Sequence, residues 1–144
     1  MDAKELMKIA RKARQNAYAP YSHFAVGAAL LAESGKVYTG CNIENASYGL
    51  TCCAERNAIF AAVGAGERRF KMLAVAADSP EPVAPSLPAS RECSPCGACR
   101  QVIAEFGIPL VVMGNLKEET KTMTAEELLP YGFGQESMNN KGEK

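Results

Sequence analysis

Three cysteines and one glutamate form the pattern in this chain with the clearest chemical meaning. Cys96 and Cys99 stand three positions apart, a common spacing for two thiolates that bind one metal ion. Cys53 lies about forty residues earlier, and Glu55 follows it by two positions. Three protein ligands leave a tetrahedral zinc ion with one open position for a water molecule. Because a carboxylate beside that position can take a proton from the water, the pattern favours a catalytic zinc site.

Other uses of the cysteines are weaker alternatives. Six cysteines would suggest three disulfides in a small secreted protein. The residues Met1 to Glu5 lack the charged and then apolar order of a signal peptide, so we expect a cytoplasmic protein with reduced thiols. Cys93, with Cys96 and Cys99, imitates part of an iron–sulfur ligand run, but the fourth cysteine and its proline are absent. We therefore interpret Cys93 as a thiol in a loop.

A closed structural zinc site would need a fourth protein ligand. His23 is the only histidine, and it is far in sequence from every cysteine pair, so we interpret it as a surface or hydrogen-bonding residue. Arg56 directly follows Glu55. It is a candidate for donating hydrogen bonds to thiolate sulfur, and a solvated helix arginine is an equally good interpretation.

Composition narrows the class of protein. The chain has 144 residues, 47% of them apolar, with 16 basic and 16 acidic side chains. We expect one domain over residues 1–134, followed by a polar, flexible tail at 135–144. The balanced charge argues against a nucleic-acid partner. The apolar runs are too short to cross a membrane.

The elements that must position these residues follow from periodicity and from turn signals. We expect a mixed sheet with helices packed against it, because hairpin, helix and strand signals alternate along the chain. The proline-dense stretch 78–95 is expected to be an extended loop. The predicted helices cover 3–17, 52–63, 96–106 and a short turn opened by a capping box at 124–127, and the predicted strands cover 25–32, 36–42, 72–77 and 110–114.

With these elements in place, the chain resembles the small zinc-dependent cytidine deaminases of nucleoside salvage. The first part of the resemblance is the zinc-deaminase signature, in which a cysteine or histidine stands two residues before glutamate and Pro-Cys-x-x-Cys follows. That signature selects Cys53 rather than Cys52 as the third ligand. The resemblance runs from about Tyr18 to Phe133. Its blocks are 19–29 (APYSHFAVGAA), 40–48 (GCNIENASY), 53–56 (CAER), 94–101 (SPCGACRQ) and 128–130 (LLP).

The resemblance implies a three-layer α/β/α fold with a mixed central sheet of about five strands and one Zn²⁺ per chain. It implies hydrolytic deamination of cytidine and 2′-deoxycytidine to uridine and 2′-deoxyuridine, with ammonia released. In that reaction a zinc-activated hydroxide attacks C4 of the base, and Glu55 shuttles protons. The zinc ligands that it implies are Cys53, Cys96 and Cys99.

The resemblance also implies a set of substrate contacts. Phe24 and the Ala54 backbone would hold the base, and Asn42 with Glu44 would hold the ribose 3′-hydroxyl. The assembly would be a homotetramer with shared sites. In it Phe133 would reach a neighbouring subunit's base, and Ala46 with Tyr48 would lie where a neighbour's loop approaches the nucleoside.

The sequence departs from the family pattern in one segment, and three rival functions stay open. The segment 79–93 is several residues longer than the family's usual connection, which leaves the rim of the site uncertain. A deaminase of nucleic acids would need a basic face. A blasticidin-S-type deaminase shares the zinc core, although the block 42–45 (NIEN) favours cytidine. A noncatalytic zinc-binding interaction module would need a closed metal shell.

Overall fold

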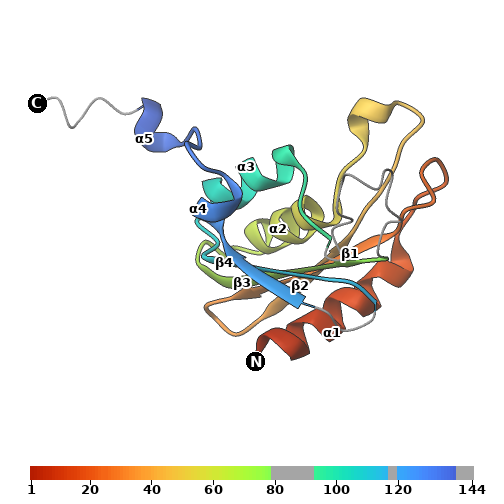
Figure 1. The fold of residues 1–144 in the computed structure, drawn as a ribbon, viewed down its shortest axis with the longest axis horizontal. Coiled ribbons are helices and arrows are strands. Elements are labelled where there is room, and N and C mark those ends of the chain that lie inside the picture. Colours follow the sequence, from red (N-terminus) through yellow and green to blue (C-terminus); the bar gives the residue numbers. More distant parts are fainter. Residues whose placement is uncertain (79–92, 117–119, 139–144) are drawn as a thin grey trace, which may run out of the picture.

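The computed structural model describes residues 1–78, 93–116 and 120–138, which form one mixed sheet flanked by helices (Figure 1). The strand order is β2-β1-β3-β4-β5. β1 is antiparallel to both β2 and β3, β3 is parallel to β4, and β4 is antiparallel to β5. This confirms the expected mixed five-stranded sheet. The strands are β1 (Val26–Ala32), β2 (Val37–Cys41), β3 (Phe70–Ala77), β4 (Leu110–Gly114) and β5 (Thr120–Thr124).

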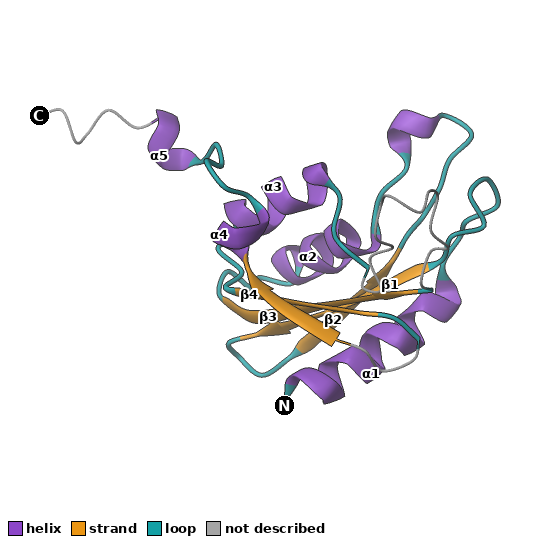
Figure 2. Ribbon diagram, viewed as in Figure 1, coloured by secondary structure: helices purple, strands orange, loops and turns teal. Residues whose placement is uncertain are grey.

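Helices cover both faces of the sheet, so the fold has three layers (Figure 2). α1 (Ala3–Ala13) packs on one face, where Leu6, Met7 and Ala10 are buried against β1, β3 and β4. α2 (Ala54–Gly64) and α3 (Gly97–Glu105) cover the opposite face, together with the short α4 (Ala125–Leu128).

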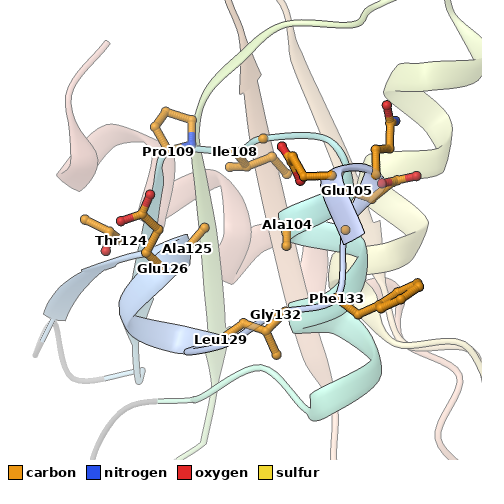
Figure 3. A pocket seen from close by; sticks show the side chains of 14 residues that line it. Ala104, Glu105, Ile108, Pro109, Thr124, Ala125, Glu126, Leu129, Gly132 and Phe133 are labelled. Carbon is orange, nitrogen blue, oxygen red and sulfur yellow. The ribbon is translucent and has the colours of Figure 1, made fainter. Parts of the chain in front are cut away.

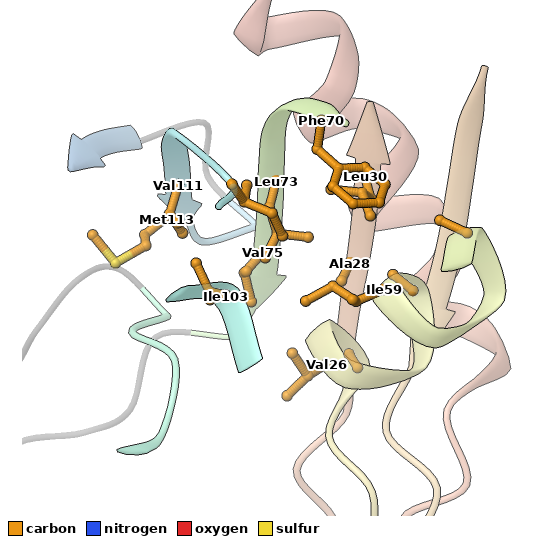
Figure 4. Close-up of a cluster of buried hydrophobic side chains, with 14 of the residues drawn as sticks. Val26, Ala28, Leu30, Ile59, Phe70, Leu73, Val75, Ile103, Val111 and Met113 are labelled. Carbon is orange, nitrogen blue, oxygen red and sulfur yellow. The ribbon is translucent and has the colours of Figure 1, made fainter. Parts of the chain in front are cut away.

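The larger core lies under α2 and α3, and Figure 4 shows its side chains. Every residue of β1 is buried, because this central strand faces a helix layer on each side. Its residues Val26, Ala28 and Leu30 point to the same face as Ile59 of α2 and Ile103 of α3. The packing fixes the two helices whose first residues carry the cysteine pattern.

Glycine allows α2 to approach the sheet closely. A Cβ atom built on Gly40 of β2 would lie 2.4 Å from the Ala54 carbonyl oxygen and 2.4 Å from the Ala58 nitrogen. Both atoms belong to the α2 backbone, so no side-chain movement would relieve the clash. Gly40 therefore sets the distance between the sheet and the start of α2.

Several predicted elements differ from those in the structure. The first helix ends at Ala13 instead of Ala17, and the chain tightens into a 3₁₀ turn at Arg14–Asn16. Its capping box between Asp2 and Glu5 is present as predicted. β5 was not located from the sequence, although the resemblance implied about five strands.

The expected tail begins with a short helix, α5 (Gln135–Met138), and the rest of it, 139–144, lies outside the described residues. Its predicted flexibility stays a prediction. The proline-rich segment 79–92, which carries the predicted insertion, is also outside them. Within the described ranges, no helix has the length and apolar character needed to cross a bilayer.

Candidate metal centre

Three sulfur atoms meet where α2 and α3 begin. The Sγ atoms of Cys53, Cys96 and Cys99 all lie within 4.8 Å of one another. The Cys53 and Cys96 sulfurs are 3.8 Å apart, and those of Cys96 and Cys99 are 3.5 Å apart. Each of the six cysteines is a free thiol. The structure therefore brings together the three ligands expected from the sequence.

The helix starts explain this convergence. Cys53 is the N-cap of α2 and Cys96 is the N-cap of α3, each with an extended backbone, while Cys99 lies in the first turn of α3. The predicted helices began at Cys52 and Cys96, so both helices start slightly later than expected. Helix N-termini carry partial positive charge, which stabilises thiolates. Pro95, which is buried, directly precedes the cap of α3.

The donor set fits a zinc ion. Bonds of about 2.3 Å from zinc to sulfur at tetrahedral angles separate the sulfurs by about 3.8 Å, close to the two measured separations. Among the described residues, no other group of three or more cysteine, histidine, aspartate or glutamate side chains is gathered tightly enough to bind a metal. Cys53, Cys96 and Cys99 would hold one zinc ion, and the described residues offer no fourth ligand to this group.

Arg56 lies against the sulfur atoms. Its Nη2 atom donates a hydrogen bond to the Cys53 sulfur at 3.4 Å, while its buried Nε atom has no hydrogen-bond partner among the described residues. Hydrogen bonds from Cys99 and then from Arg56 lower the pKa of Cys53. The hydrogen bond to Cys53, followed by burial, raises the pKa of Cys99. The surroundings therefore favour the ionised form of Cys53, and the guanidinium offsets its negative charge.

Glu55 is a buried carboxyl group next to the sulfurs. Only 4% of its surface is exposed. Burial is the main cause that raises its pKa to about 7, and the negative charge of Cys53 adds to the effect. A carboxyl group with a pKa near neutrality can both take and give a proton at physiological pH. This combination of burial, location and pKa suits a proton shuttle.

Asn42 and Glu44 lie beside a loop that carries Phe24. Asn42 is buried, its Oδ1 atom accepts from the Val26 backbone at 2.8 Å, and its Nδ2 atom donates to the Phe24 carbonyl at 2.7 Å. Glu44 Oε1 accepts backbone hydrogen bonds from Tyr21 at 2.9 Å and from Ser22 at 3.0 Å. The two polar side chains and Phe24 thus belong to one connected unit.

The remaining predicted contacts are spread over several elements. Ala54 is the first residue of α2 and is buried. Ala46 and Tyr48 are exposed, and the Tyr48 ring makes an edge contact with Tyr21 at a centroid distance of 5.8 Å. Phe24 is 40% exposed. These residues stay predictions as substrate contacts.

Phe133 is not gathered with the sulfurs. Its backbone carbonyl accepts a hydrogen bond from Gln101 Nε2 of α3 at 2.6 Å, and its side chain is 60% exposed. It lines an open hollow of about 800 Å³ framed by α3, α4 and the segment 129–136 (Figure 3). The residues that line this hollow include neither the three cysteines nor Glu55. Phe133 therefore lines a hollow to which these four residues do not contribute.

Two residues that hydrogen-bond to the surroundings of the predicted site residues were not predicted from the sequence. Arg100 holds the two residues that precede Cys96. It donates hydrogen bonds to the Pro95 carbonyl at 2.9 Å and to Ser94 Oγ at 3.0 Å. Ser22 donates its hydroxyl proton to Glu44 Oε2. Both residues stand inside blocks that carried the family resemblance, which was the available signal.

Comparisons with known proteins agree with this geometry. Residues 1–115 match the family model described as the cytidine and deoxycytidylate deaminase zinc-binding region. A cytidine deaminase from Sporosarcina psychrophila is 51% identical, and the match covers 100% of both chains. The crystal structure of a Burkholderia pseudomallei cytidine deaminase is 47% identical with a TM-score of 0.80, covering 92% of this chain and 100% of that one. A blasticidin-S deaminase from Bacillus cereus is 32% identical over 90% of each chain. This chain therefore belongs to the cytidine and deoxycytidylate deaminase family.

Proposed function

We propose that this protein catalyses the hydrolytic deamination of cytidine and 2′-deoxycytidine to uridine and 2′-deoxyuridine, with release of ammonia. The observation that carries the proposal is a buried Glu55, with a pKa of about 7, beside three thiols in zinc-binding geometry. When bound, zinc supplies a Lewis acid that makes water nucleophilic near neutral pH. The chain itself supplies the proton transfers and the recognition of the nucleoside.

Glu55 performs the proton transfers in this proposal. Its carboxylate accepts a proton from the attacking water and donates it to N3 of the cytosine ring. It then takes the proton of the new C4 hydroxyl group and gives it to the amino group, which leaves as ammonia while the C4 carbonyl forms. Arg56 moderates the charge of the sulfur cluster through its hydrogen bond to Cys53. Phe24 and the Ala54 backbone hold the base.

Asn42 and Glu44 are suited to bind one hydroxyl group. A carboxylate offers about four acceptor positions, and three of those on Glu44 are already used by Tyr21 and Ser22. An amide nitrogen offers two donor hydrogens, and Phe24 uses one of those on Asn42. One acceptor and one donor remain, which matches a hydroxyl group that donates once and accepts once. The 3′-hydroxyl of the ribose is the proposed partner.

The rival functions fit less well. A noncatalytic zinc module would need a fourth protein ligand, and the described residues supply three. A deaminase of nucleic acids would need a basic face, whereas the chain has a net charge of zero. A blasticidin-S-type activity is the second candidate to test, because a blasticidin-S deaminase from Bacillus cereus is 32% identical over 90% of each chain.

We also propose a homotetramer in which neighbouring subunits complete each other's sites. Phe133 supports the proposal, because it is 60% exposed and projects from the C-terminal segment. Phe60 of α2 and Met138 of α5 line a second, more apolar hollow beside it and are also exposed. Ala46 and Tyr48 are exposed at the other candidate contact. The cytoplasm is the proposed compartment, since six free thiols persist best in reducing surroundings.

One assay tests the proposed activity. Purified protein is given cytidine, 2′-deoxycytidine, cytosine, blasticidin S or a cytosine-containing oligonucleotide, and ammonia release is measured. We expect turnover of the two nucleosides. Glu55→Gln should lower kcat by at least about 10³-fold while the protein keeps one zinc per chain, because general acid–base catalysis is lost and the ligands are not. Glu126→Gln, which changes an exposed glutamate of α4, is the matched control.

Turnover of blasticidin S alone would replace the proposed substrate. Absence of ammonia release from every compound, with zinc bound, would overturn the enzymatic proposal. Loss of zinc in Glu55→Gln would mean that this carboxyl group maintains the metal site instead of transferring protons.

A further inference from the structure

The Ser22 side chain connects two of the proposed nucleoside contacts. Its hydroxyl group donates a hydrogen bond to Glu44 Oε2, and its Oγ atom accepts one from the Phe24 backbone at 3.0 Å. Glu44 is 22 positions away in the sequence, on the segment that follows β2. We propose that Ser22 is a positioning residue for nucleoside recognition, which orients Glu44 toward the ribose hydroxyl. This inference rests on the proposed function.

The geometry separates the part played by Ser22 from that of the backbone. The backbone N–H groups of Tyr21 and Ser22 hold one oxygen of Glu44, Oε1. The Ser22 hydroxyl is the group that holds the other oxygen, Oε2, among the hydrogen bonds of the described residues. With both oxygens held, the carboxylate cannot rotate, and the last free acceptor position on Oε2 points in one direction. Without the hydroxyl, Oε2 has two free positions and no fixed direction.

The hydrogen bond also favours the ionised form of Glu44. The Ser22 hydroxyl is the main cause that lowers the pKa of Glu44 below its ordinary value, and the backbone N–H groups of Ser22 and Tyr21 add to it. An ionised carboxylate is acceptor-only, and hydrogen bonds to it are stronger than those to a neutral group. The ribose hydroxyl therefore meets an acceptor with a defined charge and direction.

Ser22 is exposed, so removal of its hydroxyl leaves the core unchanged. The Tyr21 and Ser22 N–H groups remain in place in an alanine variant. The expected effect is therefore on substrate recognition and not on folding. Ser22→Thr keeps the hydroxyl and should rescue function.

The experiment compares cytidine with 3′-deoxycytidine, which lacks the proposed partner of Glu44. In Ser22→Ala, kcat/KM for cytidine should fall about five- to tenfold, mostly through KM. The cause is the loss of the hydrogen bond between Ser22 and Glu44, which orients the carboxylate toward the substrate. The same substitution should change kcat/KM for 3′-deoxycytidine by less than about twofold, since the two perturbations act on one interaction. Ser22→Thr should stay within about twofold of the unmodified protein for both substrates.

Ser34→Ala is the matched control. Ser34, in the turn between β1 and β2, also donates its hydroxyl to a glutamate, Glu67, at 2.6 Å. It lies at the opposite end of β1 from Ser22, so its loss should leave both substrates unaffected. Zinc content and thermal melting of every variant establish that the metal centre and the fold are intact.

Equal penalties for cytidine and 3′-deoxycytidine in Ser22→Ala would overturn the inference, because Ser22 would then act through Phe24 or the loop. No penalty with cytidine would overturn it as well. A protein that binds zinc but deaminates no nucleoside would refute the proposed function separately. The Ser22 inference is then decided by calorimetric binding of the same two nucleosides, where cytidine must lose affinity in Ser22→Ala and 3′-deoxycytidine must not.

Discussion

Replacing Glu55 by glutamine should stabilise the zinc-free protein above neutral pH, although it removes the proposed proton shuttle. Glu55 is 4% exposed, and burial raises the pKa of its carboxyl group from the ordinary value of 4.5 to about 7. Burial therefore opposes the ionised form of this side chain. Glutamine has nearly the same shape and stays neutral at every pH, so it does not carry that cost.

The size of the effect follows from linkage. The unfolded chain loses the Glu55 proton near pH 4.5, and the folded protein keeps it until about pH 7. Between these values the folded state binds more protons, so rising pH lowers the free energy of unfolding. Each pKa unit corresponds to about 1.4 kcal/mol, and the shift corresponds to about 3 kcal/mol. The stability that a protonated Glu55 contributes is fully present below pH 4.5 and is lost as pH rises through about 7.

The assay is urea denaturation of both proteins between pH 5 and 8, with a zinc chelator and a thiol reductant present. The difference in free energy of unfolding between Glu55→Gln and the unmodified chain should grow with pH, by about 2 kcal/mol over that range. All ionisable groups that the two chains share cancel to a first approximation. Glu126→Gln, which replaces an exposed glutamate of α4, is the control for the loss of one negative charge. A difference for Glu55→Gln that stays flat, or that shrinks as pH rises, would refute the reasoning.

The remaining predictions concern the approach of α2 and the assembly. Gly40→Ala should cost about 1–3 kcal/mol in free energy of unfolding, because its new Cβ atom meets the α2 backbone at Ala54. Zinc affinity of Gly40→Ala, measured by competition with a chelator, should also fall, since Cys53 is the N-cap of α2. In the control Gly49→Ala the new Cβ has no atom within 4 Å, so stability and zinc affinity should stay unchanged. Equal effects of the two variants would contradict the argument that Gly40 allows α2 to approach the sheet. Light scattering should give a mass near four times the 15.4 kDa of one chain, and Phe133→Ala should lower kcat/KM if neighbours share sites. A fully active monomer would rule out sharing.

The metal centre could be predicted from the sequence because each of its two halves is local. Cys96 and Cys99 are joined by a single helical turn, and Cys53 with Glu55 begin another helix. Proline, capping and apolar periodicity indicate where such helices start, to within one or two residues. The sequence does not show how the first residues of α2 and α3 come together. In the structure they meet because both helices bury side chains against the same sheet.

The elements that escaped prediction depend on distant partners. β5 has the sequence TKTMT, which has no clear apolar face. It becomes a strand because its backbone pairs with β4, from Leu110 opposite Thr124 to Gly114 opposite Thr120. Propensity alone is a weak guide for such an edge strand. The hydrogen bond between Ser22 and Glu44 also depends on distant partners, because the pairing of β1 with β2 brings these two residues together.

The proposed ribose contacts and the metal centre are joined through one short backbone segment. The segment from Asn42 to Glu44 is tied to the loop before β1, because Tyr18 donates to the Asn42 carbonyl and Glu44 donates to the Tyr18 carbonyl, both at 2.9 Å. Ile43 between them exchanges two backbone hydrogen bonds of 3.0 Å with Cys52, the residue before the first metal ligand.

This pairing fixes the proposed ribose contacts relative to the residue before the first metal ligand. Changes at Ser22 or Glu44 should therefore appear in KM, and changes at Glu55 should appear in kcat. A substitution that weakens the pairing of Ile43 with Cys52 is expected to alter both, because it moves one part relative to the other.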